Sequence, residues 1–348
     1  MSGDKNQTNG TDDDPTPHLF SRLERMARAV VPFVVSIALL VYVFDRIDIR
    51  LALDHVTVNV FSRFLAPLLL FSVVTVVIEA HCLHRVVAAN PAEAAPLSRI
   101  VAARIKCACY LLGLLNHFLG AAALSLLVRR RTGATIPAAA GIVFLIALLD
   151  IGSVLACVAI GGSLLQLESA ELRLGVVTAL IGLIVLGFLF LRAPFDLGPL
   201  ERVRELPVFR APRHVPIPVL LEVGALRGAM VASFAALVGG LFWAFEVDVS
   251  LVQLIFGVGV MLVIAALPLA VAGIGTGQVV FVTVFAGLAR DPELLAMSIV
   301  LSASVLASRA LLGLAFAPEF TREALEAARA EEAQHVEGED EEGREGDA

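Results

Sequence analysis

Two charged residues, Asp150 and Arg309, lie inside long apolar segments of this chain. At the centre of a bilayer a charged side chain costs about 2.5–3.5 kcal/mol on insertion scales, so each residue needs a partner or water. One interpretation is a polar lining for a headgroup or a proton path. The other is a salt bridge that holds two helices together. Exchanging the two charges tests this, because only a structural pair would recover folding and activity together.

A glycine-rich turn at residues 272–278 interrupts another apolar stretch, which also contains Pro268. Proline and three spaced glycines break a straight helix, and in hydrocarbon such a backbone persists only beside protein or a water-filled cavity. The exposed N–H groups and the helix start that follows could hold a phosphate or carboxylate. A close helix crossing is the alternative. The residues of this turn that we predict to line a cavity are Gly273, Gly275, Gly277 and Gln278.

A second interruption falls in the apolar segment 107–127, which contains Asn116 and His117. Basic residues flank both of its ends, and short basic loops favour the cytoplasmic side. The charge bias therefore predicts a re-entrant segment that enters and leaves by the cytoplasmic face, although a plain span is also possible at this length. We place Asn116 with the cavity-lining residues. The arginines after the segment, which we expect to contact headgroups or the membrane surface, are Arg129, Arg130 and Arg131.

Glu79, His81 and His84 are spaced so that they could share one helix end. They could ligate a metal, but a fourth ligand is lacking, and a position at the water interface explains them more simply. We place Glu222 and Arg227 at the start of a span, where long side chains reach headgroup level. The sequence thus predicts no metal, no cofactor and no catalytic residues.

The composition sets the class of protein. The chain has 348 residues, of which 58% are hydrophobic and 17% charged, and its mean hydropathy is +0.86. A soluble domain could not bury so much apolar surface, and several apolar runs are long enough to cross a bilayer. We predict an all-α, polytopic integral membrane protein with about six full spans and two re-entrant helical hairpins. Interrupted segments in both halves are typical of an inverted-repeat arrangement.

The organisation along the chain follows from shifts in polarity. A proline- and arginine-rich linker divides the membrane region into two halves, and polar tails, expected to be disordered, flank it. The Lys/Arg bias puts both termini in the cytoplasm and the protein in the cytoplasmic membrane. The predicted segments are the N-terminal tail 1–26, the first half 27–192, the linker 193–218, the second half 219–318 with a broken helix at 251–288, and the acidic tail 319–348.

The order of these motifs resembles the lysylphosphatidylglycerol synthase transmembrane region family, a flippase-like membrane domain found alone or fused to lipid-modifying enzymes. The matching positions are Asn116, Asp150, Gly273, Gly275, Gln278 and Arg309. The family's Pro-Gly-Arg-x-Gly-Glu motif is replaced here by the apolar residues 119–124, which indicates a divergent member. The aminoacyl-transferring part of such enzymes would be a separate soluble domain, and no segment here could form one.

The resemblance implies handling of lipids or lipid-linked groups, so translocation or binding of such a headgroup is the first hypothesis. Its partners would be membrane lipids, anionic or polyprenyl-linked. One alternative is a non-transporting scaffold for a lipid-modifying or glycosyl-transferring enzyme. Another is a membrane-embedded lipid-modifying enzyme, for which Asp150 is the only acid that we place at mid-membrane depth. Nucleic-acid binding is not indicated, because the sequence contains no soluble basic domain.

Overall fold

A computed structural model describes residues 55–115, 117–164, 201–266 and 275–316, together with scattered helical positions between 175 and 192. The first predicted span, both tails, Asn116 and Gly273 lie outside the described residues. Helices make up nearly all of the described chain, and within it the only β-type pairing is an isolated bridge between Ala286 and Ala289. The predicted all-α class is therefore confirmed.

Four described helices are long and apolar enough to cross a membrane, which supports a membrane protein. The six-span count stays a prediction, because the first span is outside the described residues and the fourth is described only in part. The four helices are α3 (Val58–Ala88), α6 (Ile136–Leu164), α10 (Ile217–Ala244) and a final helix, Asp291–Phe316.

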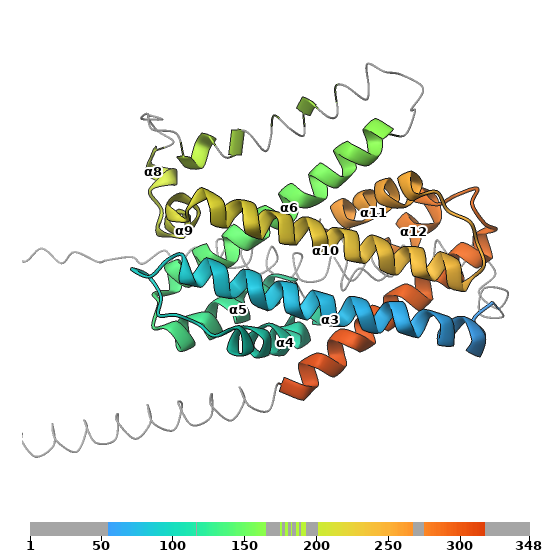
Figure 1. Cartoon of the computed structure of the whole chain (residues 1–348), viewed down its shortest axis with the longest axis horizontal. Helices are drawn as coiled ribbons and strands as arrows, with labels where there is room; N and C mark the ends of the chain where they lie inside the picture. Colours follow the sequence, from blue (N-terminus) through green and yellow to red (C-terminus); the bar gives the residue numbers. More distant parts are fainter. Residues whose placement is uncertain are drawn as a thin grey trace, which may run out of the picture.

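The helices α3 and α10 form an antiparallel pair along the middle of the bundle (Figure 1). Near one end Arg63 of α3 bonds to Glu246, just after α10, and near the other end Arg85 bonds to Glu222 at the start of α10. A Cβ atom on Gly240 would lie 2.7 Å from the Pro67 ring, so glycine allows the two helices to approach closely here.

The segment predicted to be re-entrant lies within two helices that run antiparallel to each other. The helices α4 (Arg99–Leu115) and α5 (His117–Thr132) extend beyond the predicted bounds and pack against each other as hairpin one. The N–H of Ala95 donates to the carbonyl of Thr132 at 2.9 Å, which brings the two open ends together. A Cβ on Gly120 would lie 2.8 Å from the Cα of Gly113, so the helices cross at backbone contact.

The second interrupted segment also doubles back, as hairpin two. It consists of α11 (Leu251–Ala266) and α12 (Thr276–Val284), and residues 267–274 between them are outside the described chain. The start of α11 lies beside the end of α12, because a Cβ on Gly257 would meet the Phe285 ring at 2.6 Å.

The described chain therefore contains the order helix, hairpin, helix twice. The open end of hairpin one lies beside the C-terminal end of α3, where His84 bonds to the Leu97 carbonyl. The open end of hairpin two lies beside the C-terminal end of α10, where the Phe242 ring packs edge-on against Phe285. Because α3 and α10 are antiparallel, the hairpins enter from opposite ends of the bundle (Figure 1). We call these two helix–hairpin–helix units the two repeats, and the inverted-repeat relation between them stays a prediction.

Each hairpin packs against the last helix of the other repeat. Hairpin two contacts α6, where a Cβ on Gly161 would meet the Phe256 backbone at 2.9 Å. Hairpin one contacts the final helix, where a Cβ on Gly313 would meet Leu111 at 2.6 Å. The two repeats are thus interlocked through small residues, as is common where apolar helices associate in lipid.

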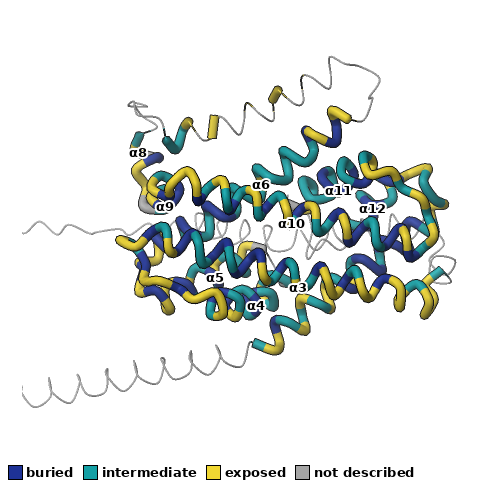
Figure 2. Tube along the Cα trace, in the orientation of Figure 1, coloured by how far each residue is buried: buried dark blue, intermediate teal, exposed yellow. Residues whose placement is uncertain are grey.

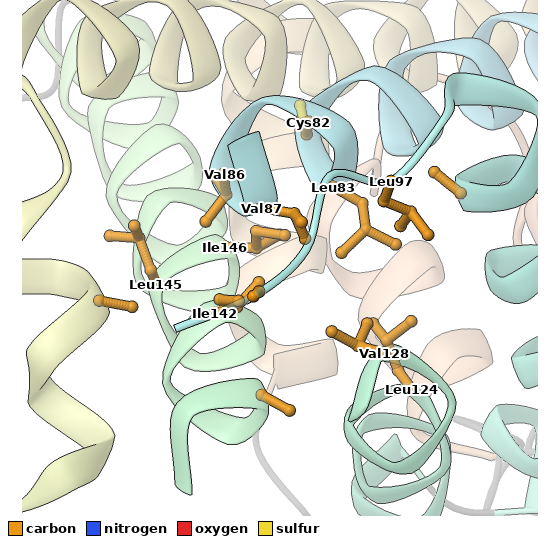
Figure 3. Packing of buried hydrophobic residues seen from close by; sticks show 14 of the residues in the cluster. Cys82, Leu83, Val86, Val87, Leu97, Leu124, Val128, Ile142, Leu145 and Ile146 are labelled. Carbon is orange, nitrogen blue, oxygen red and sulfur yellow. The ribbon is translucent and has the colours of Figure 1, made fainter. Parts of the chain in front are cut away.

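The apolar core has two main parts. One lies between α3, hairpin one and α6, where Leu83, Val128 and Ile142 meet (Figure 3). The other lies between α3, α10 and hairpin two. Figure 2 shows exposed residues along the outer faces of the long helices, and on α3 these include Leu69, Leu70 and Val73. Such apolar outer faces fit a lipid environment.

The predicted linker is partly helical. The short elements are α8 (Glu201–Arg204), η2 (Pro207–Phe209) and α9 (Arg210–His214), of which η2 and α9 pack against α6. A Cβ on Gly141 would lie 2.5 Å from the Val208 carbonyl oxygen, so this part of the linker rests directly on the helix backbone.

Candidate functional site: a charge cluster inside the bundle

Six polar side chains from five helices form one connected group, in which five are buried or half-buried in the apolar bundle and the sixth, Arg309, is exposed. Four of the five helices belong to the long, membrane-length set, and the fifth is α4 of hairpin one. We call this group the charge cluster. Its members are Glu79 of α3, Lys106 and Tyr110 of α4, Asp150 of α6, Arg227 of α10 and Arg309 of the final helix.

Arg227 is the centre of the charge cluster. Its side chain is 1% exposed, and Nη1 lies 3.1 Å from the Asp150 Oδ1 and 3.9 Å from the Glu79 Oε1. The prediction that Arg227 reaches headgroup level is wrong. It lies ten residues after Ile217, about 15 Å along α10, and the α10 face that carries it packs against α3 and α6.

Glu79 is held by α4. The hydroxyl of Tyr110 donates to its Oε2 at 2.7 Å, and the Nζ of Lys106 lies 3.4 Å from its Oε1. The placement of Glu79 with two histidines at a helix end is therefore wrong, because this carboxylate points into the bundle and is 9% exposed. Asp150 is also not the only acid at this depth.

Arg309 does not pair with Asp150, so the alternative interpretation of these two residues as a salt bridge with each other is wrong. Its guanidinium carbon lies 5.8 Å from the centroid of the Tyr110 ring, which is a cation–π distance. The partner of Asp150 is Arg227, on a helix of the other repeat. The cluster consequently links the two repeats through α6 and α10 and through α4 and the final helix.

Four charges of the cluster balance, because the cations Lys106 and Arg227 face its two carboxylates, and the third cation, Arg309, is exposed. However, the Nε and Nη2 atoms of Arg227 are buried without a hydrogen-bond acceptor, and beside the guanidinium lies the thiol of Cys82, a weak acceptor at best. Unmet donors on a buried guanidinium are costly, so the site is suited to an added anion.

Asp150 is the more exposed partner in its pair with Arg227. Its side chain is 44% exposed, whereas that of Arg227 beside it is almost completely buried. Asp150 lies near the middle of the 29-residue helix α6, about 21 Å from its first residue. A polar group could therefore approach Arg227 from this side at mid-bundle depth.

The histidines belong to a second polar group at the end of the bundle. His81 Nε2 lies 3.0 Å from the Oε1 of Glu222, and Arg85 binds the same carboxylate with two nitrogen atoms. His84 bonds to the Leu97 carbonyl. No group of three or more His, Cys, Asp or Glu side chains in the described residues could hold a metal ion. The interface interpretation of the histidines fits these contacts.

In the described part of the glycine-rich turn, polar groups bond to each other and to the final helix. Gln278 is buried; its Oε1 accepts from the Gly275 N–H at 2.7 Å, and its Nε2 donates to Ser302 of the final helix at 3.3 Å. Gly275 has φ of +88°, which favours glycine, and the Gly277 backbone faces the same serine. These contacts cap α12 and attach it to the final helix, and they do not join the charge cluster.

The three arginines that follow hairpin one occupy the last turn of α5, at the open end of the hairpin. All three are exposed. They lie at the same end of the bundle as Arg85 and Glu222, because both α3 and hairpin one terminate there.

Sequence reasoning placed Asp150 and Arg309 inside the bundle but missed Lys106 and Tyr110 and misplaced Glu79 and Arg227. A signal was available in part. Arg227 follows eight residues of a predicted span, 219–226, a depth at which an arginine needs a partner. Lys106 was grouped with the basic flank of hairpin one because nothing in the sequence distinguishes a buried lysine from an exposed one.

Comparison of the chain with protein-family models, curated protein sequences and solved structures finds no match. The resemblance to the lysylphosphatidylglycerol synthase transmembrane region family therefore rests on the motifs alone and stays a prediction.

Proposed function

We propose that this membrane protein binds the polar headgroup of a lipid or lipid-linked group and carries it across the bilayer. The observation that carries the proposal is the charge cluster, which places Glu79, Lys106, Asp150, Arg227 and a tyrosine within an apolar bundle, beside the exposed Arg309. Ionisable side chains at this depth are rare in membrane proteins and mark substrate or ion pathways.

The arrangement of the helices supports movement as well as binding. Two hairpins enter from opposite ends and lock against opposite repeats, which is the architecture in which alternating access occurs. The cluster bridges the repeats through the pair Arg227 and Asp150, so a shift of one repeat against the other would change the surroundings of these two side chains.

Orientation is part of the proposal. The three arginines at the open end of hairpin one favour the cytoplasmic side, because positively charged loops are retained there. Single cysteines introduced at Arg129 and Arg85 should then react with a membrane-impermeant thiol reagent from the cytoplasmic side only. Labelling of the two positions from opposite sides would contradict both the orientation and the hairpin.

Reconstitution in vesicles tests the function. The full-length protein is incorporated into vesicles that contain lipids with a fluorescent headgroup, and the fraction that reaches the inner leaflet is followed by chemical quenching from outside. We expect movement faster than in protein-free vesicles and a strong decrease in Arg227→Lys, which keeps the charge but loses the planar guanidinium.

The matched control is Asp248→Asn, at an exposed position in the turn after α10. This variant should move lipid at the rate of the unmodified protein. Movement at the rate of empty vesicles with every lipid headgroup supplied would contradict the proposed function.

A further inference from the structure

The two carboxylates on Arg227 are held in different ways. Glu79 is 9% exposed and receives contacts from Lys106 and Tyr110 in addition to Arg227. Asp150 is 44% exposed, and within the described chain its side chain bonds to Arg227 alone. Glu79 is thus a fixed partner of the cations, whereas Asp150 can leave by a rotation of its side chain toward its exposed side.

The guanidinium has more donor capacity than these carboxylates use. A guanidinium has five N–H donors in a planar fork that matches two oxygens of a carboxylate or phosphate. In Arg227, both described contacts to Asp150 come from Nη1, while Nε and Nη2 are buried without an acceptor. A bidentate oxyanion would satisfy more of this fork than Asp150 does.

The net charge favours the same exchange. With Asp150 in place the charges of Lys106 and Arg227 are balanced by the two carboxylates, and when Asp150 turns away one positive charge lacks a counter-ion. An oxyanion with one negative charge would take over the role of Asp150 at Arg227. Interactions between charges in such an apolar interior are much stronger than in water.

We propose that Asp150 is an exchangeable counter-ion, and that an oxyanion of the phosphate class displaces it from Arg227 when the ligand binds. This inference rests on the proposed function only in that the oxyanion is taken to be a lipid phosphodiester; free phosphate has the same chemistry. In the empty site Asp150 would occupy Arg227. The oxyanion would displace it on binding, and the ligand would be released when Asp150 returns to Arg227.

The exchange predicts an effect of unusual sign. A residue that lines a site normally weakens binding when it is replaced, but Asp150→Asn should strengthen binding of the anion, because the competing charge is removed. Glu79→Gln should not strengthen binding in this way, since Glu79 does not vacate the guanidinium. Asp248→Asn makes the same chemical change at an exposed turn and serves as the control for net charge.

The test measures binding rather than transport. Purified full-length protein in neutral detergent is titrated calorimetrically with short-chain phosphatidylglycerol, short-chain phosphatidylcholine or inorganic phosphate. We expect Asp150→Asn to bind phosphatidylglycerol at least about fivefold more tightly than the unmodified protein, within the range of typical coupling between competing sites. Asp248→Asn should change nothing, and Arg227→Lys should bind more weakly than the unmodified protein.

The outcomes separate the inference from the proposed function. Unchanged or weaker phosphatidylglycerol binding by a folded Asp150→Asn would overturn the exchange even if vesicles show lipid movement. Equal gains for phosphatidylcholine and phosphatidylglycerol would support it, because the two lipids share the phosphodiester. If inorganic phosphate gains affinity and the lipid does not, the exchange holds and the ligand is a free anion, which contradicts the lipid function. If Asp150→Asn does not fold, Asp150→Glu takes its place. Its longer side chain reaches the guanidinium with altered geometry, so an unchanged affinity for the anion overturns the proposal.

Discussion

The two repeats share one architecture but differ in what fills it. Hairpin one presents Lys106 and Tyr110 to a buried carboxylate and an arginine. Hairpin two presents Phe281 and Phe285 to Phe242 of α10, with ring centroids 4.9–6.0 Å apart. One hairpin is thus held by ionic and polar contacts and the other by aromatic packing.

This difference teaches that topology and chemistry are separate properties of the fold. Both hairpins reverse near glycine, and both pack against helices through glycine contacts at less than 3 Å from a would-be Cβ. Only hairpin one supplies ionisable groups to the interior of the bundle within the described residues. We infer that the aromatic repeat provides a firm support, against which the polar repeat can change its contacts.

The largest effect should come from the polar repeat. Arg227→Met leaves Glu79 and Asp150 without their shared cation, and breaking a buried ion pair in this way costs about 3–5 kcal/mol. Unfolding in mild detergent, followed by circular dichroism against a denaturant, would measure the loss of stability. A loss below about 1 kcal/mol would show that the cluster is well hydrated, and the contrast with the aromatic repeat would disappear.

The aromatic repeat should respond to truncation of a ring. Phe281 is fully buried and contacts both neighbouring rings, so Phe281→Ala should destabilise by about 3 kcal/mol, at the lower end of the usual range for such cavities. The same unfolding measurement applies, with Phe118→Ala at an exposed position of α5 as the control. Lipid movement at normal rate in the folded variant would agree with a supporting role for this repeat.

A substitution of Tyr110 can separate the contribution of its hydroxyl hydrogen bond from that of its ring. Tyr110→Phe removes the hydroxyl that donates to Glu79 and keeps the ring beneath Arg309, so we expect a loss of about 1.5–3 kcal/mol, typical of a hydrogen bond to a charged group. Combining it with Glu79→Gln in a double-mutant cycle checks the assignment. Simple additivity of the two changes would show that the side chains do not interact.

The smallest loss of stability is expected from Gly→Ala substitutions at the helix crossings within the two hairpins. Gly120→Ala places a Cβ against the Gly113 backbone, which cannot yield, and should cost about 1–3 kcal/mol. Gly257→Ala meets the side chain of Phe285, which can shift, so its cost should be lower. Gly152→Ala, where no atom lies within 4 Å of the new Cβ, is the control. Equal losses at both crossings would indicate that the hairpins are equally rigid.

Much of the architecture could be predicted from patterns in the chain. Apolar run lengths indicated membrane helices, and the basic residues on both sides of segment 107–127 indicated that the chain turns back within it. The break at the glycine-rich turn was expected from Pro268 and the glycines. In the described part of the turn Gln278 bonds to Gly275 and Ser302 and not to the charged residues, and a cavity lined by this turn stays a prediction.

The charge cluster was only partly predictable. Asp150 and Arg309 stood out because each is a single charge in an apolar run, but their pairing with each other did not follow from that. Glu79 and Arg227 are close in sequence to the polar segments that flank their spans. The sequence analysis therefore placed them near the membrane interface.

The amino-acid sequence by itself determined that this chain enters a membrane as helices and where those helices break, because both follow from local composition and the cost of exposing backbone to hydrocarbon. Only the tertiary structure decided which charges meet. Arg227 and Asp150 are separated by 77 residues, and Arg227 and Glu79 by 148, and each lies on a different helix. Their contact depends on the rotation and depth of packed helices, which no local pattern specifies.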